Sequence, residues 1–186
     1  MIENIFSTPL LRTKMNLNIN DLLNTCYEIA DKEEGAQNSN VGGYQSQPIR
    51  AEYPVLNELC YVVTEQANFF SKYLGLRKIE LSNFWININK YKDYNSIHDH
   101  PGCLVSGVFY IKTPTDCGKI LFRHPSPTMR YFLNEQDFTE KNLINSELIN
   151  YSPEEGALFL FPSWIEHQVS ANLSNEDRVS LAFNFL

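Results

Sequence analysis

The chain has 186 residues, of which 43% are hydrophobic and 20% are charged, and its formal net charge is −7. This length and composition are typical of one globular domain that buries a hydrophobic core. The negative charge disfavours duplex nucleic acid as the main partner, because a phosphate backbone requires a basic face. A small anion held by one or two buried arginines remains compatible with it.

The four cysteines, Cys26, Cys60, Cys103 and Cys117, show no C-x-x-C spacing, so neither a zinc ribbon nor a thioredoxin motif is expected. We interpret all of them as buried thiols in a reducing compartment. The N-terminus lacks the basic start and apolar run of a signal peptide, and no apolar stretch approaches the length of a membrane span. A cytoplasmic protein without a membrane partner is therefore expected.

The first third of the chain is predicted to be helical. A helix over residues 20–33 would have Asn20 as its N-cap and would end at Gly35. A second helix is expected over residues 55–74, because its apolar residues recur at three-and-four spacing and Gly75 is a natural stop. The polar, turn-rich residues 36–50 between them are predicted to form a loop.

From Ile79 onwards the hydrophobic period becomes two, which is typical of strands. In residues 84–91 one face is apolar, whereas the other, with Trp85, Asn87, Asn89 and Tyr91, could line a cavity. Further strands are expected at about 103–112, 119–124, 156–161, 167–171 and 178–186.

Together these elements predict a single domain over residues 1–186 that is mainly β with N-terminal helices. Its core, residues 79–186, would be an antiparallel jelly roll (a double-stranded β-helix), and residues 1–78 would pack helices on one sheet. The long polar segment 125–153 is expected to be a loop insertion at the rim of a site. This segment and residues 36–50 are our candidates for substrate contact.

Three of the four histidines fall where they could converge on one metal ion. His98 and His100 are two residues apart, so in a strand their side chains would point the same way and Asp99 would point away. The strands of a jelly roll could bring the distant His167 beside them. Imidazoles suit iron, zinc, copper or nickel. Solvent-exposed or core histidines are the alternative for each residue alone, but for the set we favour a metal site.

The last strand supplies a candidate anion site. Between Arg178 and the end of the chain, alternate residues form an apolar face, and the opposite face has Arg178, Ser180, Ala182 and Asn184. If that polar face lines the interior, the buried Arg178 needs an anion, and a carboxylate is its best partner. Alternatively, Arg178 lies in water and pairs with Asp177 or Glu176.

Aromatic residues could complete this site. Tyr110 shares a strand face with Ser106 and Val108, and its hydroxyl could help to hold the same carboxylate; an ordinary half-buried tyrosine is the alternative. Trp85 and Trp164 could line the cavity, although core packing explains both tryptophans equally well.

These segments together resemble the iron(II)- and 2-oxoglutarate-dependent oxygenases, and in particular a group of members found in marine phages and bacteria. The resemblance spans nearly the whole chain and rests on the following segments: Ile5–Leu10, Gly42–Ser46, Trp85–Asn87, His98–Gly102, Ser106–Ile111, Phe161–His167 and Arg178–Asn184. The run Phe-Pro-Ser-Trp, followed by His, Arg and Phe-Asn, is a specific signal for this family. An H-x-H pair alone would be weak evidence for it.

The resemblance implies an enzyme with Fe(II) and 2-oxoglutarate as cofactors, O₂ as co-substrate, and succinate and CO₂ as products of a hydroxylation. The metal ligands would be His98, His100 and His167, and the 2-oxoglutarate carboxylate would meet Arg178 and Tyr110. Ser180 and Asn184, on the face of Arg178, are further cofactor-binding candidates. The family's usual second ligand is an acid, so either His100 replaces it or Asp99 turns inwards to supply a carboxylate.

Two other functions remain in competition at this point. One is a cupin-like metal protein that binds through three histidines and does not use 2-oxoglutarate. The other is a non-catalytic phage accessory or structural protein. The resemblance extends the expected location to the cytoplasm of a phage-infected host cell. The sequence leaves the primary substrate and homodimer formation open.

Overall fold

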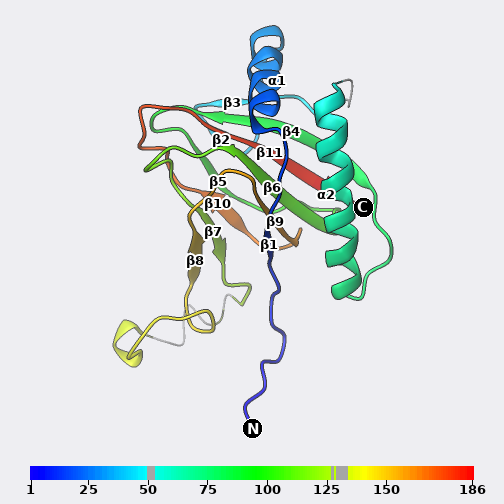
Figure 1. The fold of residues 1–186 in the computed structure, drawn as a ribbon. Helices are drawn as coiled ribbons and strands as arrows, with labels where there is room; N and C mark the ends of the chain where they lie inside the picture. The colour runs from blue at the N-terminus through cyan, green and yellow to red at the C-terminus, as the bar shows by residue number, and fades with distance from the viewer. Residues whose placement is uncertain (50–52, 127, 129–133) are drawn as a thin grey trace.

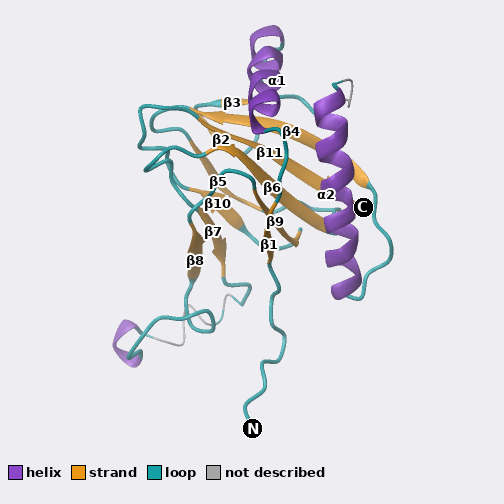
Figure 2. Cartoon of the chain, in the orientation of Figure 1, coloured by secondary structure: helices purple, strands orange, loops and turns teal. Residues whose placement is uncertain are grey.

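A computed structural model of the chain describes residues 1–49, 53–126, 128 and 134–186. Two helices, α1 (Ile19–Lys32) and α2 (Pro54–Tyr73), and a short 3₁₀ helix (Glu135–Asp137) accompany the strands (Figures 1 and 2). The strands are β1 (Leu11–Lys14), β2 (Asn40–Val41), β3 (Tyr44–Gln45), β4 (Leu81–Asn89), β5 (Tyr94–His98), β6 (Val105–Lys112), β7 (Ile120–Arg123), β8 (Leu148–Tyr151), β9 (Ala157–Pro162), β10 (His167–Val169) and β11 (Arg178–Phe185).

The strands form two antiparallel sheets. The larger sheet has six strands in the order β1-β9-β6-β11-β4-β3, and the smaller has five in the order β2-β5-β10-β7-β8. Strands that follow one another in the chain often belong to different sheets, which is the arrangement of a jelly roll. The predicted mainly-β fold with N-terminal helices, a double-stranded β-helix, is confirmed.

The main hydrophobic core lies between the two helices and the six-stranded sheet, which both helices cover on one side (Figure 1). β11 directs Val179, Leu181, Phe183 and Phe185 into this core, and all of them are fully buried. α2 supplies the opposing apolar residues at helical spacing. The apolar face of the last strand therefore packs under the helices, which leaves the face of Arg178 to line the interior between the sheets.

The opposite face of the six-stranded sheet looks towards the smaller sheet. A second cluster fills part of this space with Tyr110, Phe122, Phe159, Phe161 and smaller apolar neighbours. Polar side chains of β4 and β11 occupy the same face, since residues alternate along each strand. The interior between the sheets is therefore apolar at one end and polar at the other.

The helix ends differ in how well the sequence predicted them. α1 begins after Asn18, whose side chain accepts a hydrogen bond from the backbone of Asp21, so the predicted N-cap Asn20 is wrong. It also ends at Lys32, before the predicted stop at Gly35. α2 ends as expected: Gly75 has a positive φ of 73°, and the following amide donates to the carbonyl of Ser71.

Several strands arise where the sequence predicted loops or nothing. Residues 36–50 contain β2 and β3, and residues 125–153 contain the 3₁₀ helix and β8, apart from the positions that lie outside the described residues. β2 and β3 have two residues each, too few for a period to show, and they exist because they pair with β5 and β4. β1 and β5 were also missed.

Two smaller expectations can be compared with the structure. Cys26, Cys60 and Cys117 are buried as predicted, but Cys103 is partly exposed, because it lies in the turn between β5 and β6. Neither of the described helices combines the length and the hydropathy that crossing a membrane requires.

Phe183 provides a test of the core. It is fully buried and stacks on Phe84 with ring centroids 6.0 Å apart. We expect Phe183→Ala to lower the free energy of unfolding by about 3–5 kcal/mol, through lost burial and a cavity. The matched control Phe69→Ala, at a position 66% exposed on α2, should change it by less than about 0.5 kcal/mol. Urea denaturation measures both, and equal losses would contradict this core.

Candidate functional site

The three histidines of the predicted metal site meet in the smaller sheet, where β5 ends and β10 begins. His98 ends β5 and His167 begins β10, and the two residues are direct partners in the antiparallel register. His100 lies two residues beyond β5, where its backbone amide donates to the carbonyl of Ser163 at 3.0 Å. Residues almost 70 positions apart in the chain are thus brought together by strand pairing.

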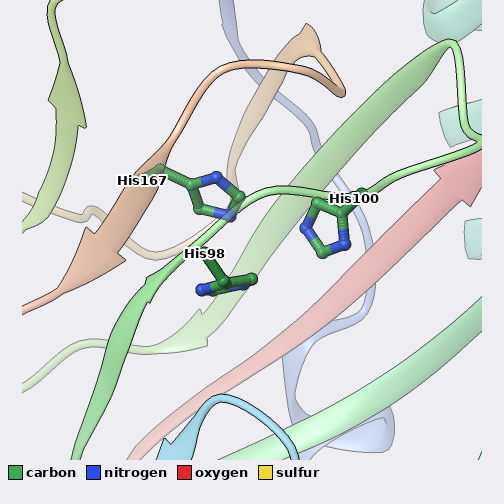
Figure 3. A group of neighbouring side chains, drawn as sticks. All are labelled: His98, His100 and His167. Atoms are coloured by element: carbon green, nitrogen blue, oxygen red, sulfur yellow. The ribbon is translucent and has the colours of Figure 1, made fainter. Parts of the chain in front are cut away.

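The three rings face a common point (Figure 3). The ring centroid of His98 lies 5.1 Å from that of His100 and 4.3 Å from that of His167, and the remaining pair is 5.1 Å apart. One nitrogen of each ring lies within 4.8 Å of the corresponding nitrogens of the other two. Three donors at this separation can coordinate one metal ion.

Hydrogen bonds to backbone carbonyls fix the orientation of two of these rings. Nδ1 of His98 lies 2.7 Å from the carbonyl oxygen of Ser96, and Nδ1 of His167 lies 3.0 Å from that of Ile165. Because a carbonyl oxygen only accepts, each Nδ1 must hold the proton, which leaves the lone pair on Nε2. Such partners are typical of histidines that bind metals.

Burial keeps the cluster uncharged. Loss of solvent lowers the pKa of His98, lowers that of His100 to about 4 and lowers that of His167 to about 3, and mutual repulsion between the rings adds to the effect for His100 and His167. All three imidazoles are therefore neutral at pH 7. Neutral imidazole is the form that coordinates metals.

Asp99 and His124 lie outside this group of three. Asp99 is exposed, and its carboxylate is not among the donor atoms that gather within 4.8 Å. Nδ1 of His124 accepts a hydrogen bond from the backbone of Ser126. Within the described parts of the chain, His98, His100 and His167 form the one group of this kind. The ligand assignment itself stays a prediction.

Arg178 is buried between the two sheets, with 1% of its surface exposed. Its Nη1 donates to the carbonyl oxygens of Cys117 and Ser170, but its Nη2 has no partner. The alternative of a solvated Arg178 paired with Asp177 or Glu176 is wrong. Asp177 accepts from Tyr27 at 3.1 Å, and Glu176 pairs with Lys112 at 3.0 Å.

The loop before β7 holds this guanidinium in place. Gly118 has a φ of +87°, and a Cβ there would lie 2.8 Å from Nη1 of Arg178. Glycine is therefore required on both counts, because other residues rarely adopt this conformation and a side chain would displace the arginine. The loop approaches closely enough for the carbonyl of Cys117 to accept from Arg178.

An inner cavity connects Arg178 to the three histidines, and all four residues line it. Several buried polar atoms in its wall have no hydrogen-bond partner: Oη of Tyr110, Nη2 of Arg178, Oδ1 of Asn87 and Nδ2 of Asn89. Unpaired polar atoms in a protein interior cost free energy. A polar ligand in this cavity would satisfy them.

The inner cavity includes most of the predicted cofactor residues. Tyr110, Arg178 and Ser180 line it together. Asn184 lies elsewhere: its amide accepts from Ser106 and donates to Asn83, and it lines a second, outer cavity. Asn87 and Asn89 line the inner cavity as the polar face of residues 84–91 predicted, although the sequence did not place them among the cofactor-binding candidates.

The outer cavity opens beside the histidines and has a volume of about 510 Å³. Trp85, His98 and His100 line both cavities, so the two meet at the cluster. Trp164, the other tryptophan considered for the cavity wall, is 56% exposed and lines neither of them.

Comparison with known families decides what kind of site this is. A family model described as "Putative 2OG-Fe(II) oxygenase" matches residues 83–184, which is more than half of the chain. The chain belongs to this family. Its cofactors are accordingly Fe(II) and 2-oxoglutarate, and the protein is a 2-oxoglutarate- and Fe(II)-dependent oxygenase. The matched segment contains the three histidines, Tyr110 and Arg178.

Solved structures of other oxygenases share the fold at low sequence identity. A prolyl-4-hydroxylase from Pseudomonas putida matches with a TM-score of 0.69 and 15% identity over 96% of this chain and 92% of its own. The 2-oxoglutarate-dependent epimerase of nogalamycin biosynthesis gives a TM-score of 0.72 and 13% identity over 96% and 78%.

HygX from Streptomyces hygroscopicus, crystallised with nickel and 2-oxoglutarate, gives a TM-score of 0.63 and 11% identity over 96% and 82% of the two chains. No curated protein sequence matches the chain significantly. At identities of 11–15%, these solved structures establish only that this chain shares their fold. Family membership rests instead on the match of the family model to residues 83–184.

The residues present fit both cofactors of the family. Three neutral imidazole nitrogens can hold a divalent iron ion. The unpaired Nη2 of Arg178 and Oη of Tyr110 are hydrogen-bond donors in the same cavity. A carboxylate, which only accepts, would satisfy both of them.

Metal binding distinguishes His100 from Asp99. We expect His100→Ala to weaken Fe(II) binding by at least about 100-fold, because it removes one of three donors. Asp99→Ala should change it by less than about threefold, since only a nearby exposed charge is lost. Anaerobic titration calorimetry measures both, with His124→Ala as the control. The reverse ranking of the two variants would make Asp99 the ligand.

Proposed function

We propose that this oxygenase hydroxylates its substrate, with succinate and CO₂ as co-products. In this proposal His98, His100 and His167 bind Fe(II), and Arg178 and Tyr110 bind the distal carboxylate of 2-oxoglutarate. The observation that supports it best is the unpaired guanidinium of Arg178 in the cavity that the three histidines also line. The family supplies the cofactors, and this geometry supports the assignment of these residues to them.

The charge of Arg178 is the main argument for an anionic ligand. Only 1% of the surface of Arg178 is exposed, and this loss of solvent lowers the pKa of its guanidinium. No ion pair of Arg178 occurs among the described residues. A carboxylate in the inner cavity would supply the missing counter-charge and accept from Nη2 in a geometry that suits guanidinium.

Tyr110 would provide a neutral donor to the same carboxylate. It is buried, and desolvation raises the pKa of its phenol, so the hydroxyl stays protonated over the whole physiological range. Its ring packs edge-on against Phe159 with centroids 6.0 Å apart, which fixes the direction of the hydroxyl. Ser180 lies opposite Tyr110 in the register of β6 and β11.

Fe(II) with bound 2-oxoglutarate supplies the chemistry by which O₂ is reduced and a C–H bond of the substrate is oxidised. The protein contributes the surroundings of this reaction. The carbonyls of Ser96 and Ile165 orient two of the imidazoles, and the apolar residues between the sheets exclude water from one side. Substrate would enter from the outer cavity, which reaches the same histidines.

Three neutral ligands would change the electrostatics of the iron. The family's usual pair of histidines with one acid leaves an Fe(II) site with a net charge of +1, whereas three imidazoles leave +2. The more positive centre would attract an anionic co-substrate more strongly, and the convergence of the nitrogens of His98, His100 and His167 supports this set.

The two competing functions are less well supported. A cupin-like metal protein without 2-oxoglutarate would have no use for a buried guanidinium and phenol facing the metal cavity. A non-catalytic phage accessory protein would not require three histidines whose donors converge. The match to an oxygenase family favours neither alternative.

Binding of 2-oxoglutarate tests the proposal. Anaerobic Fe(II) protein should develop a visible charge-transfer band when 2-oxoglutarate is added. Arg178→Gln should raise the concentration needed for half of the band at least about 30-fold, because a buried ionic hydrogen-bond pair is worth 2 kcal/mol or more. The matched control Lys112→Gln removes a cation that pairs with Glu176 on the surface and should leave the titration unchanged.

The band itself discriminates between the functions. Its absence in protein that binds Fe(II) would support the cupin-like alternative, and failure to bind Fe(II) would support the non-catalytic one. An Arg178→Gln titration identical to that of the unmodified protein would remove Arg178 from its proposed role. The thermal unfolding temperature of each variant shows whether it is folded.

A further inference from the structure

The outer cavity is where this chain would select its primary substrate. It has a volume of about 510 Å³, and small-molecule sites generally have volumes of this size. His98 and His100 form part of its wall, so a ligand there would lie beside the metal cluster. The residues that line it therefore indicate the chemistry of the substrate, which neither the family nor the fold identifies.

The charges in this wall are one-sided. Asp99 is the single carboxylate among the described residues that line the outer cavity, and these residues include no lysine or arginine. Phosphate and carboxylate ligands are normally held by such cations. The net charge of −7 adds a long-range preference in the same direction. Anionic substrates are disfavoured, and a positively charged group is favoured.

A buried polar atom in the same wall also has no partner. Gln45 is only 5% exposed, and its Oε1 makes no hydrogen bond. The neighbouring polar groups are already engaged: Ser46 bonds to the backbone of Gln47 and Ile86, and Asn184 bonds to Ser106 and Asn83. Gln45 thus has an acceptor available for a ligand N–H group.

Trp85 adds an aromatic surface to the same wall. It lines the outer cavity, and its ring centroid lies 5.8 Å from that of His100. An indole face contacts aliphatic chains well and also attracts cations. An aliphatic chain on Trp85 would therefore lie next to the metal cluster, where its C–H bonds could be oxidised.

We propose that the outer cavity binds a substrate with a cationic nitrogen on an aliphatic chain, held by the Asp99 carboxylate, the Gln45 amide and the face of Trp85. This inference rests on the proposed function only for the oxidation of the bound chain. The binding preference itself follows from the wall of the cavity. The cation would belong to a free amine or to a lysine-like side chain of a peptide.

Three probes that differ in charge test the preference. They are N-acetyl-lysine amide, its norleucine analogue, which lacks the ammonium group, and N-acetyl-glutamic acid amide. Trp85 reports binding by fluorescence in a Trp164→Phe background, because the chain has two tryptophans. The lysine probe should bind about fivefold more tightly than the norleucine probe, the difference expected for one solvent-accessible ion pair. The glutamate probe should bind most weakly.

Two variants assign this preference to residues. Asp99→Asn should remove the fivefold advantage of the lysine probe, whereas Asp31→Asn, which deletes an exposed carboxylate on α1 outside the cavity wall, should retain it. Gln45→Met should weaken the lysine probe about fivefold, because a hydrogen bond to a charged group is lost. A glutamate probe that binds as tightly as the lysine probe, or unchanged affinity in both Asp99→Asn and Gln45→Met, would overturn the proposal.

The same samples separate this inference from the proposed function. If Fe(II) and 2-oxoglutarate give the charge-transfer band but the probes show no charge preference, the cavity proposal fails and the oxygenase assignment stands. If the preference appears without the band, the cavity proposal stands and the assignment of 2-oxoglutarate to Arg178 fails. The peptide Gly-Gly-Lys-Gly-Gly distinguishes the two sources of the cation. If it binds more tightly than the lysine probe, the cation belongs to a peptide side chain, and if it binds more weakly, the cation belongs to a free amine.

Discussion

The two-residue alternation of side chains along β4 and β11 is the constraint on which the rest of this structure depends. One face of these paired strands is buried under the helices, and the other supplies Asn87, Asn89, Arg178 and Ser180 to the inner cavity. A slip of one residue would exchange the faces and place the guanidinium in the hydrophobic core. The free energy of burying the apolar face therefore also holds the polar face in place.

The electrostatics of the interior are complementary to the pair of cofactors. One end of the inner cavity has a guanidinium whose Nη2 has no hydrogen-bond partner among the described residues, and the other has three uncharged imidazoles with lone pairs available for a cation. A protein interior without ligands gains nothing from either arrangement, since both leave polar groups unsatisfied. Such local costs are typical of functional sites, where the ligand provides the missing partners.

The cluster of histidines is also the place where the two cavities meet. Trp85, His98 and His100 belong to both walls, so a co-substrate that reaches Arg178 and a substrate near Asp99 would approach the same metal from different directions. The turn that contains Ser163 supports this junction. Its backbone accepts from His100, and its hydroxyl bonds to Ser106, which in turn donates to Asn184.

Local patterns in the sequence predicted the longer regular elements, and they predicted the chemistry of the site. The apolar positions of α2 and β11 were predictable because each repeats over several turns or pairs of residues, and the types and spacing of His98, His100, His167 and Arg178 indicated a metal with an anion. Tertiary structure alone decided what depends on contacts between distant segments. Pairing with β4 and β5 created β3 and β2, pairing of β5 with β10 placed His167 beside His98, and the β6–β11–β4 register placed Asn184 in the outer cavity. Local periodicity contains no information about such pairings, because their free energy comes from residues far away in the chain.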